Sequence, residues 1–140
     1  MKIDIILCEK ADDDLRNYIN VFDEITLEDH QRFSFTAVCN VKYEEDRTEE
    51  IIIHFFLTND KDGKVMALYL SEVSIVRTDE DLELDEETFK VEFKNIPILE
   101  KGKMHLIAVR NDNMKNTGIE LGKQIFITGT PVGDAEFIVK

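Results

Sequence analysis

Side chains mostly alternate between apolar and polar along residues 32–43 (RFSFTAVCNVKY). One face of this stretch carries Phe33, Phe35, Ala37, Cys39, Val41 and Tyr43. A repeat of two residues is the period of a β-strand, and it does not fit the 3.6-residue period of a helix. Residues 88–94 (TFKVEFK) alternate in the same way. The chain is therefore expected to build pleated layers that share an apolar interior.

The first half of the chain contains further strand patterns. Residues 2–8 carry apolar side chains at every second position, and residues 50–58 (EIIIHFFLT) are apolar on both faces. The second pattern is typical of a central strand that is covered from two sides. Asp62-Gly63 separates it from a strand over 64–70, which a bulge would extend to residue 76. The Asp-Gly pair predicts a hairpin, because glycine accepts a positive φ.

In the second half, residues 101–109 (KGKMHLIAV) and 123–128 (KQIFIT) are predicted to form an antiparallel pair joined by the loop 111–118. Residues 131–140 are expected to add an edge strand or to remain a loose tail. Residues 12–22 fit either a helix or a strand that follows a turn, and the β patterns around them favour the strand.

Together these patterns predict one domain over residues 1–140 with an all-β fold. The expected architecture is an antiparallel β-sandwich of seven to nine strands with immunoglobulin-like, Greek-key connections. A closed small barrel is the alternative. Nine phenylalanines and many Ile and Val residues suit a pleated, half-buried surface. A chain of 140 residues can form a core of its own.

The most acidic stretch is 78–87 (TDEDLELDEE), which lies between two strand patterns. Seven of its side chains are carboxylates: Asp79, Glu80, Asp81, Glu83, Asp85, Glu86 and Glu87. We expect the stretch to cross from one sheet to the other, with Leu82 and Leu84 packed on the sandwich and the carboxylates in water. The same seven residues are the candidate site for a cationic partner, and a metal cage is the third interpretation.

The formal net charge is −13, and it lies in residues 1–100, since residues 101–140 carry six basic and four acidic side chains. Such a field disfavours nucleic acids and anionic membranes as partners. It favours a protein partner with basic character. An acidic body can also occupy a groove built for phosphates, so the runs 79–87 and 44–50 (EEDRTEE) suggest a nucleic-acid mimic as an alternative function.

The sequence contains no GxSxG, HExxH or CxxC motif and no glycine-rich phosphate loop. His54 and His105 lie within strand patterns and His30 lies in a polar turn, which favours packed or solvated roles. The sequence therefore predicts a protein that is not an enzyme and that uses no cofactor.

Calcium is considered because Asp60, Asp62 and Gly63 resemble part of an EF-hand loop. The closing glutamate is missing and strands flank the segment, which favours a simple hairpin. Aspartates from several loops at one end of a sandwich could still bind the ion. The candidates are Asp12, Asp13, Asp14, Asp60, Asp62, Asp112 and the run 79–87. A calcium-binding module is thus a further alternative, with no metal ligand assigned.

No apolar run approaches the ~20 residues that span a bilayer. Residues 1–14 lack the apolar stretch and the cleavage site of a signal peptide. A cytoplasmic location is expected. Cys8 and Cys39 fit that compartment as small buried apolar residues, and a disulfide between them is the alternative.

Four segments resemble a known family in their order: ILCEKADDD (6–14), INVFDEI (19–25), FKVEFKNIPILEKGKMHLIAV (89–109) and LGKQIFI (121–127). The family is an uncharacterised bacterial family of small β-sandwich proteins, described as a domain of unknown function. Ile96-Pro97-Ile98, Gly102 and Leu121-Gly122 are the matching positions. The resemblance implies an immunoglobulin-like or similar sandwich, and it implies no activity and no functional residue.

The expected function is non-catalytic binding of another protein through a strand edge or a loop end. The open edges of a sandwich accept an added strand unless charge or bulges block them. The sequence leaves the identity of the partner, the oligomeric state and the order of the strands open.

Overall fold

The computed structural model describes residues 1–61, 64–98 and 100–140. These residues form nine strands: β1 (Lys2–Ala11), β2 (Tyr18–Val21), β3 (Glu24–Ile25), β4 (Arg32–Lys42), β5 (Glu49–Lys61), β6 (Lys64–Arg77), β7 (Glu86–Pro97), β8 (Gly102–Arg110) and β9 (Thr130–Val139). The helical segments are the short 3₁₀ turns η1 (Asp79–Asp81) and η2 (Ile119–Leu121) and the helix α1 (Gly122–Thr128). The fold is all-β, as the alternating patterns predicted.

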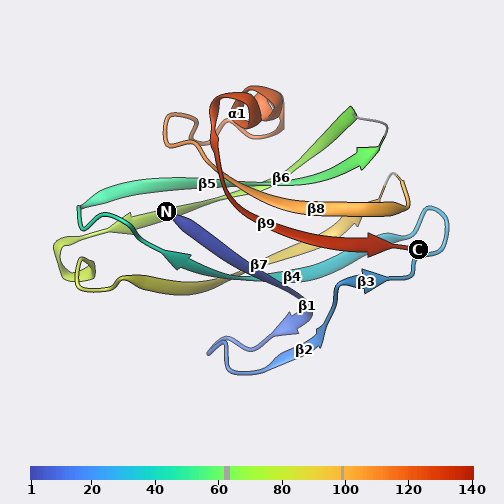
Figure 1. Cartoon of the computed structure of the whole chain (residues 1–140), viewed down its shortest axis with the longest axis horizontal. Coiled ribbons are helices and arrows are strands. Elements are labelled where there is room, and N and C mark those ends of the chain that lie inside the picture. The colour runs from blue at the N-terminus through green and yellow to red at the C-terminus, as the bar shows by residue number, and fades with distance from the viewer. Residues whose placement is uncertain (62–63, 99) are drawn as a thin grey trace.

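The strands form two sheets that pack face to face (Figure 1). One sheet has the order β2-β1-β4-β7 and the other the order β3-β9-β8-β5-β6. The described pairs are antiparallel except for β3 with β9. The neighbours β1-β4-β7 and β9-β8-β5 correspond to the A-B-E and G-F-C orders of immunoglobulin-like sandwiches. The prediction of a sandwich is confirmed, because the two sheets stay separate.

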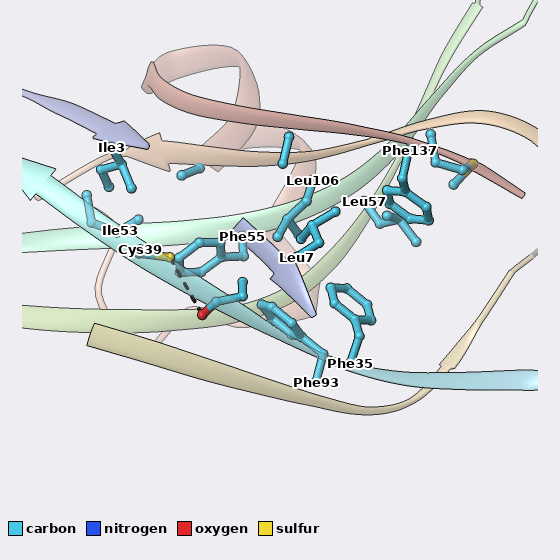
Figure 2. Close-up of a cluster of buried hydrophobic side chains, with 14 of the residues drawn as sticks. Ile3, Leu7, Phe35, Cys39, Ile53, Phe55, Leu57, Phe93, Leu106 and Phe137 are labelled. Atoms are coloured by element: carbon cyan, nitrogen blue, oxygen red, sulfur yellow. Dashed lines mark hydrogen bonds between the residues drawn. The ribbon is translucent and has the colours of Figure 1, made fainter. Parts of the chain in front are cut away.

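The core lies between the sheets and consists mainly of aliphatic and phenylalanine side chains (Figure 2). Phe35 and Phe93 extend from adjacent strands of one sheet with ring centroids 5.1 Å apart. Phe55 of the opposite sheet meets Phe93 at 5.7 Å. All three rings are buried, and burying a phenylalanine contributes ~1.5–3 kcal/mol. The inward face predicted for β4 is confirmed, because its core-lining side chains occur at every second position.

Residues 12–22 contain strand β2, as the neighbouring patterns favoured, and no helix. A turn precedes the strand, closed by hydrogen bonds of 3.0 Å from Asp12 N to Asn17 O and from Leu15 N to Asp12 O. β5 is a central strand between β8 and β6, which explains why its sequence is apolar on both faces. β5 and β6 pair as an antiparallel hairpin, while the turn predicted at Asp62-Gly63 lies outside the described residues.

The prediction for residues 123–128 is wrong. They belong to helix α1 and do not pair with 101–109. Both edges of β8 are occupied, by β5 on one side and by β9 on the other. The apolar run 125–127 therefore finds no unpaired edge of β8 to which it could add a strand. It forms part of a helix that packs on the outer face of the sheet instead. A short apolar run has no distinct period, so the sequence pattern could not separate the two structures.

The final segment also differs from the expectation for 131–140. β9 is an ordered strand with β8 on one side and the two-residue β3 on the other, so it is neither a tail nor the outermost strand. Gly133 brings β9 close to β1 of the opposite sheet, because a Cβ at this position would lie 2.7 Å from the carbonyl oxygen of Ile3. The backbones of β1 and β9 therefore approach closely along this side of the sandwich, without pairing into one sheet.

Candidate functional site

An apolar groove lies on the outer face of the second sheet, between the edge strand β6 and α1, and we call it the β6–α1 groove. Figure 1 shows α1 above the sheet that contains β5 and β6. The groove has a volume of about 420 Å³. Its lining consists of Phe56, Ala67, Leu68, Tyr69, Ile119, Gly122, Lys123, Phe126 and Ile127. One of these side chains, Lys123, is charged, so the surface is mainly apolar.

Two isoleucines of the groove are unusually exposed. Ile119 is 80% accessible and Ile127 is 67% accessible. Exposed apolar side chains beside a concave apolar surface are typical of binding sites for proteins or ligands. Burial of such a side chain against a partner would contribute up to ~1.5–3 kcal/mol. The groove is therefore the strongest candidate for a binding surface in the described residues.

Asn111 holds α1 on the sheet. Its side-chain amide donates hydrogen bonds to the carbonyl oxygen of Ile125 at 3.2 Å and to the hydroxyl of Thr128 at 2.9 Å. Ile125 is fully buried in the cluster beneath the helix. The helix ends at Gly129, where a Cβ would lie only 2.3 Å from a methyl group of Val109. One wall of the groove is thus positioned by close packing and by a buried amide.

His54 of β5 lies below the groove and is fully buried. Its Nε2 is 3.3 Å from the carbonyl oxygen of Asn111, and its Nδ1 is 3.2 Å from the hydroxyl of Tyr69. A carbonyl can only accept, so Nε2 donates to Asn111, and Nδ1 pairs with the hydroxyl of Tyr69. Burial and the charge of Glu72 raise the pKa of Tyr69 to about 12. His54 therefore positions Tyr69 at the groove.

β6 is the outermost strand of its sheet in the described part of the chain. Its pairing with β5 shifts register between Phe55 and Phe56, where Leu70 is the additional residue on β6. Val76, near the end of the strand, is 60% exposed. An outermost strand presents backbone hydrogen-bonding groups to a strand of another chain. The groove and an open sheet edge thus belong to the same strand.

The acidic stretch 78–87 follows β6 and crosses to β7 in the other sheet, which confirms the predicted crossing. A buried arginine holds it in place. Arg77 is 2% exposed and donates to the carbonyl oxygens of Glu45 at 2.7 Å and of Leu84 at 3.0 Å. Its guanidinium carbon also lies 3.9 Å from the centroid of the Tyr43 ring. Hydrogen bonds from a charged donor contribute ~1.5–3 kcal/mol each, so Arg77 is a main support of the crossing.

The expected packing of the two leucines is only partly observed. Leu82 is half-buried, whereas Leu84 is 47% exposed. The crossing is held mainly through its backbone carbonyl groups, which accept hydrogen bonds from Arg77, and less through apolar side chains.

The crossing presents most of its carboxylates to solvent. The exposed ones are Asp79, Glu80, Glu83, Asp85 and Glu86. Asp81 accepts hydrogen bonds of 2.9 Å from the amide and the hydroxyl of Thr78, which lowers the pKa of Asp81. Glu87 accepts a hydrogen bond of 2.9 Å from the hydroxyl of Tyr43. Five of the predicted partner-binding residues thus face water, while Asp81 and Glu87 are engaged within the protein.

A second acidic loop lies beside this crossing. The amide of Tyr43 donates to the carbonyl oxygen of Asp85 at 2.9 Å, and Arg77 binds carbonyl groups of both loops. The side chains of Glu44 and Glu45 are 76% and 65% exposed. The runs 44–50 and 79–87 therefore share one end of the sandwich although they are distant in sequence.

The aspartates considered for calcium do not assemble where the structure describes their side chains. Asp13 forms an ion pair of 2.8 Å with Lys90, which lowers the pKa of Asp13. Asp112 forms an ion pair of 2.9 Å with Arg110. Asp62 and the side chain of Asp60 lie outside the described part of the structure. Across residues 1–61, 64–98 and 100–140, no group of three or more His, Cys, Asp or Glu side chains is placed to hold a metal ion.

The remaining histidines lie apart from the groove lining. His30 is exposed in a turn. His105 of β8 is half-buried, and its Nδ1 lies 2.9 Å from a carboxylate oxygen of Asp134 on the neighbouring strand β9. These positions agree with the solvated and strand roles that the sequence indicated.

The two cysteines are free and buried. Cys39 faces the core, whereas Cys8 belongs to a small cluster on the outer face of the first sheet. The alternative of a disulfide is therefore not observed. Burial raises the pKa of Cys39 to about 12, so its thiol stays protonated near neutral pH.

Sequence reasoning missed the groove residues of α1 because it assigned them to a strand. A usable signal was present. Gly122 and Gly129 flank the run 123–128, and glycine is common just after the last residue of a helix. Ile119 and Ile127 could then have been recognised as apolar residues on a short insertion, with no strand partner.

The fold and site define a class: an acidic, immunoglobulin-like β-sandwich with an apolar groove beside an open edge strand. No family model and no curated protein matches the chain. Among solved structures, the chain is similar to a β-glucosidase from Listeria innocua, with 11% identity, a TM-score of 0.49, and coverage of 99% of this chain and 16% of that one. The complex of the same enzyme's D270A mutant with laminaribiose gives 13% identity, a TM-score of 0.48, and coverage of 84% and 14%.

The chain spans only about one sixth of the length of that enzyme or less. A likeness at this identity concerns the fold alone. The described part of this chain contains no helix with the length and apolarity that a bilayer crossing requires.

Proposed function

We propose that this protein is a non-catalytic interaction module that binds a segment of another protein along the edge of β6 and in the β6–α1 groove. The observation that carries the proposal is the exposure of Ile119 and Ile127 beside an apolar groove. The opposite wall of this groove is β6, the outermost described strand of its sheet. Strand addition supplies backbone hydrogen bonds, and a neighbouring pocket supplies selectivity for a side chain. A cytoplasmic location belongs to the proposal, since two buried free cysteines suit a reducing compartment.

The resemblance of residues 6–14 and 121–127 to an uncharacterised sandwich family remains part of this proposal. It assigns no activity, so the proposal depends on the groove and the edge.

The test is affinity purification from the native lysate with the wild-type protein and with Ile127→Asp. A partner that inserts an apolar side chain into the groove should be lost with Ile127→Asp, because a carboxylate would be desolvated in the complex. The matched control is Ile138→Asp on β9, another exposed isoleucine, at 44% accessibility. Proteins recovered equally by both variants would contradict the proposal.

A second candidate function is an acidic mimic that occupies the nucleic-acid groove of a basic protein. The observation that favours it is the placement of the runs 44–50 and 79–87 at one end, with their carboxylates largely in solvent. The same purification, repeated at about 0.05 M and about 0.3 M salt, separates the two functions, because contacts that replace phosphates weaken steeply with salt. A partner held mainly through the groove should be retained at the higher salt.

A further inference from the structure

We infer that the partner segment combines a bulky apolar residue with a group of basic residues, held apart by an extended stretch that pairs with β6. This inference rests on the proposed function and specifies the chemistry of the partner. The groove and the open edge carry it, and the acidic crossing adds the complementary charge. The occupant is an extended segment of another protein.

The apolar end of the site is built around Tyr69. Phe56 and Tyr69 meet edge to face with ring centroids 5.3 Å apart, and Phe126 meets Phe56 at 5.1 Å. Together with Ile119 and Ile127 they surround a space of about 420 Å³. This volume and lining suit the side chain of Leu, Met, Phe or Trp better than a charged group.

The charged end of the site lies where β6 ends. Arg77 is the last residue of β6, and the exposed carboxylates of Asp79 and Glu80 follow at once. Arg77 itself is buried and bound to carbonyl groups, so it does not face a ligand at this end. A segment that leaves β6 here would meet carboxylates of the crossing and of the neighbouring loop 44–50.

The distance between the two ends follows from strand geometry. At about 3.3 Å per residue, the stretch from Tyr69 to Asp79 spans about 30 Å, with allowance for the bulge at Leu70. A partner strand of the same length places its basic residues about eight to ten positions from its apolar residue. Between the two ends, Val76 adds an exposed apolar contact on β6.

A second copy of this chain is a poor occupant of the site. Each copy carries a net charge of −13, and a second β6 edge would bring another acidic crossing with it. Like charges in such an arrangement repel, whereas a basic segment gains from the same field. The charge therefore selects a basic heterologous partner.

The test is a display selection of random 16-residue peptides against the wild-type protein, followed by affinity measurement of one selected peptide. We expect enrichment of one bulky apolar residue with at least two Lys or Arg residues about eight to ten positions away. Ile127→Asp should weaken that peptide at least about tenfold, by loss of the apolar contact. A variant with Asp79→Asn, Glu80→Gln, Asp85→Asn and Glu86→Gln should weaken it by a similar factor and reduce its salt dependence. Ile138→Asp should leave it unchanged.

Separate measurements test whether the peptide binds as an added strand beside β6. Strand addition should slow hydrogen exchange of backbone amides in β6, and methylation of alternate peptide nitrogens should abolish binding.

Selected peptides that need Ile127 but carry no basic residues would overturn the inference and leave the proposed function standing. Basic peptides that bind Ile127→Asp normally would overturn both and favour the mimic. A selection without enrichment would overturn the inference, while the partner purification would still test the proposed function.

Discussion

Arg77 illustrates how one buried charge organises a surface. Its guanidinium is enclosed between the Tyr43 ring and the carbonyl groups of Glu45 and Leu84. These carbonyl groups belong to two acidic loops, so the cation offsets part of the repulsion between their side chains. Among the described residues the Nε of Arg77 has no hydrogen-bond partner, which indicates that the site is held mainly by the two terminal nitrogens.

Replacement of Arg77 by Met should lower the free energy of unfolding by about 2–4 kcal/mol, because buried carbonyl groups lose a charged donor. Urea denaturation measures the change. The matched control is Arg47→Met in the neighbouring loop, whose side chain is 62% exposed. The control should change stability by less than about 0.5 kcal/mol. Equal effects of the two substitutions would show that Arg77 does not support the crossing.

Tyr69 should make the stability of the folded protein fall at alkaline pH. Its pKa is raised to about 12 in the folded protein by burial and by the charge of Glu72, whereas an unfolded tyrosine titrates near ~10. The unfolded chain therefore loses this proton first as pH rises. The stability that Tyr69 contributes is complete below about pH 10 and is lost as pH approaches about 12.

Tyr69→Phe should reduce the loss of stability between about pH 10 and about 12, because the group that titrates is removed. Denaturant titrations at several alkaline pH values measure the slope. Tyr18→Phe on the exposed strand β2 is the control for removal of a hydroxyl. A slope for Tyr69→Phe identical to that of the wild type would contradict the coupling.

At the scale of elements, α1 is a short insertion that a single polar residue attaches to the sheet. A helix of seven residues is too short to be stable alone in water. It is formed here because Ile125 enters an apolar cluster and Asn111 binds its last turn. The stability of the groove wall that α1 forms therefore depends on these contacts.

Asn111→Ala should destabilise α1 locally by about 1–2 kcal/mol, because two hydrogen bonds to the helix are lost. Hydrogen exchange of the amides in 122–129 should become about ten-fold faster, while exchange in β4 stays the same. Asn113→Ala, at an exposed position of the same loop, is the control. Uniform acceleration over both sheets would instead show that Asn111 supports the whole sandwich.

For the whole molecule, the dominant electrostatic feature is the net charge of −13. Many exposed ion pairs are present, for example Lys103 with Glu136, but such pairs contribute little. Self-repulsion of the excess carboxylates should therefore exceed the attraction that the ion pairs provide.

Addition of sodium chloride from about 0.02 M to about 0.5 M should raise the melting temperature by several degrees, since screening weakens the repulsion. Differential scanning calorimetry at neutral pH measures the shift. The control is sucrose, which is uncharged and excluded from protein surfaces, at matched osmolality. A melting temperature that falls with salt would show that the local ion pairs outweigh the repulsion.

The amino-acid pattern by itself determined the pleated layers, the central position of β5 and the acidic crossing after β6. Each depends on local periodicity or on charge, and both are visible within about ten residues. Tertiary structure alone decided that 123–128 form a helix, that β9 takes the place beside β8, and that the runs 44–50 and 79–87 meet. Whether a short apolar run pairs as a strand depends on whether a distant neighbour has an open edge, and a single segment does not contain that information.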